Sequence, residues 1–241
     1  MSEIRTPLAV HRTVLAVDVR GFGDQGRNTP AQVAVRAGMY RALERAFRAA
    51  GLSWRECHRE DRGDGVFVLA PAETPKGPFV ETLPRALVTE LRAHNAKHPP
   101  AEQIRLRMAL HAGEVTFDDH GVTASAVNLT FRLLDAPAVK QALAESPGVL
   151  ALIASGWFFD EVVRNSAALD AATFRPVRVA VKETDTVAWI SLPDHPYPPA
   201  AEQAPPAEEP PSPAPAVTMT ATNSGRGSIY QAARDQHITE R

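Results

Sequence analysis

Short apolar runs alternate with longer segments of helical periodicity in the first part of the chain. Residues 13–17 (TVLAV) form a brief apolar run that ends at Asp18 and is followed by a glycine-containing turn, which predicts a buried strand. Between residues 28 and 50 the apolar positions recur at helical spacing, and Thr29 before a proline is the expected N-cap. The pattern therefore predicts a strand, a turn and an amphipathic helix, in this order.

The segment 58–69 (HREDRGDGVFVL) contains a tight turn between two short runs. Its Gly-Asp-Gly sequence at 63–65 favours a turn, residues 66–69 are β-branched enough for a strand, and residues 52–59 can form the partner strand. The prediction is a hairpin whose tip presents Asp64. A carboxylate on such a turn either forms the turn or ligates a metal, and Asp-Gly taken alone favours the turn.

The remaining pattern predicts an α/β (α+β) domain with one mixed sheet and helices packed mainly on one face. Its β-α-β-β-α-β start is the ferredoxin-like arrangement. The further elements are expected as helices at 79–97 and 125–144, strands at 104–111, from 112 and at 149–154, a short helix at 156–164, and a closing hairpin of 174–181 with 186–192.

Composition changes abruptly near the end of the chain. Ten of the 21 prolines lie between residues 193 and 215, with acidic residues among them. A segment of this kind cannot bury enough apolar surface to order itself. We therefore expect three parts: a domain over 1–192, a proline-rich disordered linker over 193–221, and a short tail over 222–241. The tail either frays or orders on a protein partner, and its mixed apolar and polar residues slightly favour the partner.

The overall composition limits the classes of function. With 44% hydrophobic residues and a formal net charge of -2, the chain can build a core and lacks the positive charge that attracts nucleic acid. The single cysteine, Cys57, excludes a disulfide framework and a cysteine-based zinc site. The sequence shows neither a secretory signal nor a run of about 18 apolar residues, so a cytoplasmic protein without a membrane partner is expected.

Two carboxylates fall at positions where they can meet. Asp18 ends the first strand and Asp64 tips the hairpin, and in a ferredoxin-like sheet these strands can lie side by side. Neighbouring carboxylates repel one another unless a cation lies between them, and oxygen-only ligands favour magnesium or manganese. Asn128 and Arg132, four residues apart, share a helix face that suits a developing negative charge on phosphate; a solvated helix face is the alternative.

Taken together, these residues resemble the catalytic domain of the class III nucleotidyl cyclases (adenylate and guanylate cyclases), in a divergent, actinobacterial-type form. The likeness extends in order over residues 13–192. VLAVDVRGFGD resembles the first metal strand with Asp18, EDRGDGVFV resembles the hairpin with the second metal aspartate, Asp64, LRMALHAGEV resembles a strand ending in Gly-Ile-His-Thr-Gly, and VNLTFRLLD resembles the helix with the transition-state residues Asn128 and Arg132.

The resemblance implies a reaction in which the 3′-hydroxyl of a nucleoside triphosphate attacks the α-phosphorus and releases pyrophosphate and a 3′,5′-cyclic nucleotide. It implies two Mg²⁺ or Mn²⁺ ions bridged by the paired aspartates, with Val19 also assigned to the metal site. The backbone of residues 19–22, including Gly21 and Phe22, is expected at the phosphates. In this family the asparagine and arginine come from the opposite protomer, so a head-to-tail homodimer carries two symmetric sites.

The chain departs from the family at its substrate-reading positions. In place of an adenine-reading lysine it has Glu60, the residue type of guanylate cyclases, which can accept hydrogen bonds from guanine. The alternative for Glu60 is a surface strand residue paired with an arginine. The second base-reading position, near residues 121–123, matches neither type, which leaves a pyrimidine substrate open. Lys182 lies near the place of the family's triphosphate-binding lysine, but the Lys-Gly-Lys pattern is absent.

Two functions are therefore compatible with the sequence. The first is an active, metal-dependent nucleotide cyclase in signal transduction, supported by the joint presence of both aspartates, the asparagine and the arginine. The second is a catalytically inactive, cyclase-like nucleotide-binding sensor or adaptor of a multi-component signalling or defence system. It is supported by the altered base-reading positions and the missing lysine pattern. The sequence favours the enzyme narrowly.

Overall fold

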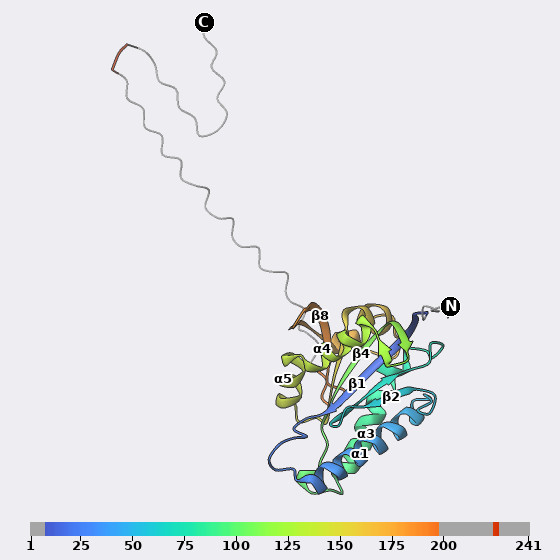
Figure 1. Cartoon of the computed structure of the whole chain (residues 1–241). Coiled ribbons are helices and arrows are strands. Elements are labelled where there is room, and N and C mark those ends of the chain that lie inside the picture. The colour runs from blue at the N-terminus through green and yellow to red at the C-terminus, as the bar shows by residue number, and fades with distance from the viewer. Residues whose placement is uncertain (1–7, 198–223, 227–241) are drawn as a thin grey trace, which may run out of the picture. The chain divides into compact units, whose positions relative to one another are not determined.

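The computed structural model describes residues 8–197 and 224–226 (Figure 1). The chain divides into two units, 1–200 and 201–241, and the fold described below lies within the first. The expected linker at 193–221 and tail at 222–241 fall mostly outside the described residues, so these boundaries stay predictions. In the described ranges, no helix is both long enough and apolar enough to cross a membrane.

An eight-stranded mixed sheet forms the centre of the domain and confirms the predicted fold class. Its strands follow the order β2-β3-β1-β4-β6-β8-β7, with β5 paired to β4 beside this path. β4 and β6 pair in parallel, and the other neighbours are antiparallel. The strands are β1 (Val10–Val19), β2 (His58–Asp61), β3 (Gly65–Leu69), β4 (Leu106–Asp118), β5 (Gly121–Thr123), β6 (Leu150–Ser155), β7 (Arg175–Val181) and β8 (Thr184–Ser191).

Helices cover both faces of the sheet, and the longest lie on one face (Figure 1). On that face α1 and α3 pack side by side over a core that includes Leu15 and Val17 of β1. The opposite face is covered by α4 and α5, against Ala16 of β1. The helices are α1 (Thr29–Ala49), α2 (Pro78–Glu81), α3 (Leu83–Asn95), α4 (Ser125–Asp135), α5 (Pro137–Glu145) and α6 (Gly156–Phe158), with a π-helical segment at Phe159–Val163 and 3-10 segments at Pro100–Glu102 and Ala171–Thr173.

The strand β1 is buried on both faces because it lies between β3 and β4 and has helices above and below. Its residues 13–17 are at most 2% exposed, which explains why they form a continuous apolar run without alternation. Successive side chains of a strand point to opposite faces, so Asp18 shares the α4 face with Ala16. The strand thus places Asp18, its next-to-last residue, on the α4 side of the sheet.

Two side chains set helix boundaries that periodicity alone did not locate. Pro137 lacks a backbone N–H and cannot continue a helix, so the expected helix at 125–144 is the pair α4 and α5. The N-cap of α1 is Asn28 and not Thr29, since Asn28 Oδ1 accepts a hydrogen bond from the backbone N of Ala31 at 3.0 Å. Local backbone chemistry therefore corrects both expectations.

The strand β4 continues past residue 112, where a separate strand was expected, and carries His111 near its middle. Nδ1 of His111 lies 2.8 Å from Oγ of Ser155. Burial lowers the pKa of His111 from 6.5 to about 4, and the nearby ring of His11 adds to this effect. The imidazole is therefore neutral in the folded chain above the acid range.

We expect the His111 ring to make the domain less stable as the pH falls. The unfolded chain takes up a proton at this residue near pH 6.5, whereas the folded chain does so only near pH 4, so its stabilising contribution is complete above 6.5 and is lost between these values. The loss is on the order of 3 kcal/mol. Urea unfolding from pH 7 to pH 4 measures it, and His111→Gln should flatten the profile. An unchanged slope in the variant would show that other groups carry the dependence.

Candidate active site

Of the two aspartates expected to hold metal, Asp18 lies on β1 and Asp64 lies in the β2–β3 turn, directly before β3. β1 and β3 pair antiparallel with Asp18 opposite Gly65, and the backbone N of Val19 donates to the carbonyl oxygen of Asp64 at 2.9 Å. A Cβ on Gly65 would lie 2.1 Å from the carbonyl oxygen of Val17. Glycine is therefore required at this position, because only its small size lets the hairpin approach β1 and place Asp64 beside Asp18.

A cavity of about 170 Å³ joins the two aspartates to the end of α4. Its lining includes Asp135, a third carboxylate that sequence reasoning missed. The only sequence signal for it was its position three residues after Arg132, one helical turn along α4. The residues that line the cavity are Val17, Asp18, Arg62, Asp64, Gly65, Phe131, Leu134 and Asp135.

Arg107 of β4 binds Asp18 through both carboxylate oxygens, at 2.7 Å from Nε and 2.6 Å from Nη2. Both side chains are largely buried, with 14% and 13% of their surfaces exposed. Burial raises the pKa of Asp18 to about 6; Arg107 opposes this rise, while the charges of Asp64 and Asp135 add to it. Sequence reasoning missed Arg107, although it stands directly opposite Asp18 in the antiparallel register.

The paired aspartates fit a divalent ion in their donor chemistry. Both offer only oxygen atoms, the ligands that Mg²⁺ prefers, and the burial that disfavours the charged form of Asp18 is offset by a cation. Among the described residues, no three histidine, cysteine or acidic side chains are grouped so as to hold a metal ion. Mg²⁺ is commonly held by one or two carboxylates together with substrate phosphates, and the pair Asp18 and Asp64 suits that arrangement.

Asn128 and Arg132 lie on α4 but do not line this cavity. The side chain of Asn128 is exposed. Nη2 of Arg132 lies 3.1 Å from Oε1 of Glu183, in the turn between β7 and β8. Within one chain, the structure does not bring these two residues to the aspartates.

Glu60 is tied into a small charged cluster on β2. Its Oε1 lies 3.0 Å from Nε2 of His58, and its Oε2 accepts a hydrogen bond from Nη2 of Arg62 at 2.8 Å. The guanidinium of Arg62 lies 5.1 Å from the ring centroid of Phe131 and lines the cavity. Glu60 is therefore connected to the cavity through Arg62, which sequence reasoning did not single out.

The other expected substrate residues lie in turns outside the cavity lining. Gly21 has a φ of 65°, in the left-handed region that glycine tolerates, in the turn after β1. Phe22 packs against the α1 side of the core, and the side chain of Val19 is buried there, so that only the backbone of Val19 is left for a ligand. Lys182 is exposed in the β7–β8 turn with a φ of 51°.

Comparison with solved structures shows the fold of adenylyl and guanylyl cyclase domains. The guanylyl cyclase Cya2 is 20% identical with a TM-score of 0.53, over 76% of this chain and 92% of that one. An adenylate/guanylate cyclase/hydrolase from Silicibacter pomeroyi is 16% identical with a TM-score of 0.54, over 78% and 100%. The catalytic core of a rhodopsin-guanylyl cyclase with converted specificity, in complex with ATPαS, is 14% identical with a TM-score of 0.52, over 76% and 96%. No protein-family model and no curated protein sequence matches the chain.

Proposed function

We propose that this protein is a metal-dependent nucleotide cyclase that converts a nucleoside triphosphate to a 3′,5′-cyclic nucleotide and pyrophosphate. The observation that carries the proposal is that Asp18 of β1 and Asp64 of the adjacent β2–β3 turn line one cavity, in a domain with the cyclase fold. Gly65 maintains that meeting by allowing close strand contact. Two carboxylates beside a cationic arginine form a site suited to a metal-bound polyphosphate.

In the proposed reaction, the two aspartates would hold two Mg²⁺ or Mn²⁺ ions, and Val19 would contribute through its backbone. Bound there, the ions would lower the pKa of the attacking 3′-hydroxyl and offset charge on the triphosphate. Arg107, which here pairs with both oxygens of Asp18, would be free to bind phosphate oxygens bidentately if Asp18 held a metal ion instead. The backbone of Gly21 and Phe22, after β1, contacts the phosphates, and Lys182 adds charge from the β7–β8 turn.

The proposed active form is a head-to-tail homodimer. Asn128 and Arg132 lie on α4 outside the cavity of their own chain, so they serve a site formed with a second copy. There the amide and the guanidinium stabilise the negative charge that develops on the transferred phosphorus. Arg132 must leave Glu183 to do so. A monomer therefore has the metal ligands Asp18 and Asp64 at its cavity, but its own Asn128 and Arg132 lie outside that cavity.

Glu60 is the proposed base-reading residue. Its carboxylate accepts hydrogen bonds from the N1 and N2 hydrogens of guanine but cannot donate to adenine N1, which favours GTP. We expect Glu60→Lys to raise the ratio of kcat/KM for ATP to that for GTP by at least about tenfold, because mismatched donors leave buried polar groups unpaired. Initial rates with both nucleotides measure the ratio.

The matched control for Glu60→Lys is Glu56→Lys, which makes the same charge change at an exposed residue before the hairpin. Its nucleotide preference should equal that of the unaltered chain. If Glu60→Lys folds, as judged by its melting temperature, and keeps the original preference, Glu60 does not read the base.

The second candidate function is a nucleotide-binding sensor or adaptor without turnover. Two ion pairs favour it: Arg107 occupies both oxygens of Asp18, and Arg132 is engaged by Glu183. If these pairs persist when nucleotide binds, Asp18 does not bind a metal ion and Arg132 does not stabilise the transition state. In that case the expected tail at 222–241 would pass the signal to a protein partner.

Incubation with each of the four ribonucleoside triphosphates and Mn²⁺, followed by mass spectrometry of the products, separates the two functions. A 3′,5′-cyclic nucleotide that requires the metal supports the cyclase and identifies its base. Nucleotide binding without product, at protein concentrations where a dimer forms, supports the sensor and contradicts the cyclase.

A further inference from the structure

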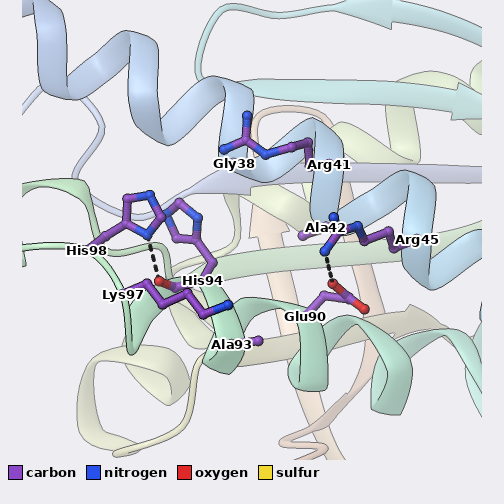
Figure 2. Close-up of a pocket in the computed structure, with 9 residues that line it drawn as sticks. All are labelled: Gly38, Arg41, Ala42, Arg45, Glu90, Ala93, His94, Lys97 and His98. Carbon is purple, nitrogen blue, oxygen red and sulfur yellow. Dashed lines mark hydrogen bonds and ion pairs between the residues drawn. The ribbon is translucent and has the colours of Figure 1, made fainter.

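A second cavity lies between α1 and α3, on the face of the sheet opposite the candidate active site (Figure 2). Its volume is about 140 Å³, well above the roughly 10–15 Å³ that a single water site needs. Nothing in the proposed reaction uses it. Its lining is Gly38, Arg41, Ala42, Arg45, Glu90, Ala93, His94, Lys97 and His98.

Small residues let the two helices form this cavity. A Cβ on Gly38 would lie 2.5 Å from Cε1 of His94. The imidazole of His94 can therefore pack against α1 only because residue 38 is glycine. The ring of His94 stacks on that of His98, with centroids 3.7 Å apart and planes inclined by 16°. Nδ1 of His98 donates to the carbonyl oxygen of His94 at 2.7 Å. Nε2 of His98 is therefore the nitrogen of that ring available to a ligand.

The charge around the cavity is strongly positive, although the chain as a whole carries -2. The lining contains three permanent cations, on Arg41, Arg45 and Lys97, and one carboxylate, on Glu90. Of these, only Arg45 and Glu90 form an ion pair, at 3.4 Å between Nη1 and Oε2. Among the described residues, the side chains of Arg41 and Lys97 have no hydrogen-bond or ion-pair partner. The close-up shows both beside the histidines without a carboxylate between them (Figure 2).

The cations also act on the imidazoles. Burial lowers the pKa of His94 below its usual value, and the charges of His98 and Arg41 lower it further, while the hydrogen bond from Nε2 to the carbonyl oxygen of Glu102 and the charge of Glu102 oppose this. Positive charge is therefore concentrated at this cavity beyond what the helices neutralise by themselves. An anion that enters it would relieve the repulsion between these groups.

We propose that the cavity between α1 and α3 binds a phosphate group. An arginine fork and a lysine ammonium match a compact anion with several oxygen acceptors, and the cavity is wide enough for one such group and its waters. The phosphate comes either from the free inorganic ion or from a small phosphate monoester. The proposal does not depend on the cyclase reaction, because none of the residues involved lies at the aspartate pair.

The test is a titration of the ¹⁵N-labelled full chain with inorganic phosphate, and separately with AMP, at constant ionic strength kept with chloride. We expect saturable changes in the imidazole signals of His94 and His98 with at least one probe and none in the signal of His111, which lies on the other face. Tighter binding of AMP assigns the site to a monoester, and tighter binding of inorganic phosphate assigns it to the free ion. These site-resolved signals also separate this cavity from phosphate bound at the aspartates.

The double variant Arg41→Gln/Lys97→Gln should bind the same probe at least about tenfold more weakly, since two charge-assisted contacts are lost. The control Arg48→Gln/Arg85→Gln removes one charge from α1 and one from α3, both outside the cavity, and should leave the affinity unchanged. All four residues are exposed, so folding is preserved. The proposal is overturned if neither probe shifts the two imidazoles, if chloride alone shifts them, or if the double variant binds as tightly as the control.

Discussion

Replacing Asp64 with asparagine should lower metal-dependent turnover by at least about a hundredfold without unfolding the domain. The neutral amide is a much poorer ligand for a divalent cation than a carboxylate, and the several kcal/mol of charge stabilisation that a metal supplies corresponds to this loss of rate. Asp64 is exposed at the hairpin tip, and its charge adds to the repulsion on Asp18, so the fold loses little. Pyrophosphate release with Mn²⁺ and the melting temperature are the two measurements.

A matched control for this substitution lies on the same hairpin. Asp61 contacts Arg36 and Tyr40 of α1 on the opposite side of the sheet, and it does not line the cavity. Asp61→Asn should therefore keep turnover within about threefold of the unaltered chain, because it weakens only exposed contacts that contribute little to stability. If Asp64→Asn turns over normally while its metal requirement persists, Asp64 is not a metal ligand.

Mixing two inactive variants should restore activity. Asp64→Asn removes a metal ligand from one half of the proposed shared site, and Arg132→Ala removes the transition-state cation from the other half. In a mixed dimer, one of the two sites then combines an intact Asp64 with an intact Arg132. With free subunit exchange, an equimolar mixture should reach about a quarter of the unaltered activity, because half of the dimers are mixed and each has one working site. Pyrophosphate release by each variant and by the mixture measures this.

The control mixture is Asp18→Asn with Asp64→Asn. Both substitutions damage the same half of the site, so every site in the mixed dimer lacks one aspartate and no activity should return. Arg132→Ala alone should lower kcat far more than it raises KM, because the arginine acts on the transition state. Mixed dimers that form, as shown by mass spectrometry of the assembly, but stay inactive would place Arg132 in its own chain's site or outside the chemistry.

Part of the candidate active site at Asp18 and Asp64 could be predicted from the sequence. The apolar run before Asp18 predicted a buried strand, and the Gly-Asp-Gly turn predicted a hairpin with Asp64 at its tip. Local patterning thus gave both aspartates and their elements. Their pairing in the sheet required the register of β1 and β3, and the sequence indicated this only through the order of its elements.

Local sequence patterns located most helices and strands but not all of the residues at which they begin and end. Asn28 displaced Thr29 as the cap of α1, and Pro137 divided the helix expected at 125–144, both for backbone reasons that periodicity does not report. The roles assigned to Asn128 and Arg132 stay predictions, since within one chain these residues lie outside the cavity.

What the sequence determined by itself was the set of elements and the carboxylates at their ends, because strand burial, turn geometry and helix periodicity are encoded by neighbouring residues. Only the tertiary structure decided which distant charges meet. Arg107 faces Asp18 across 89 positions, and Asp135 joins them from the end of α4. On the other face, Arg41 of α1 and Lys97 of the turn after α3 line one cavity. Such contacts depend on sheet register and helix packing, which no local pattern specifies.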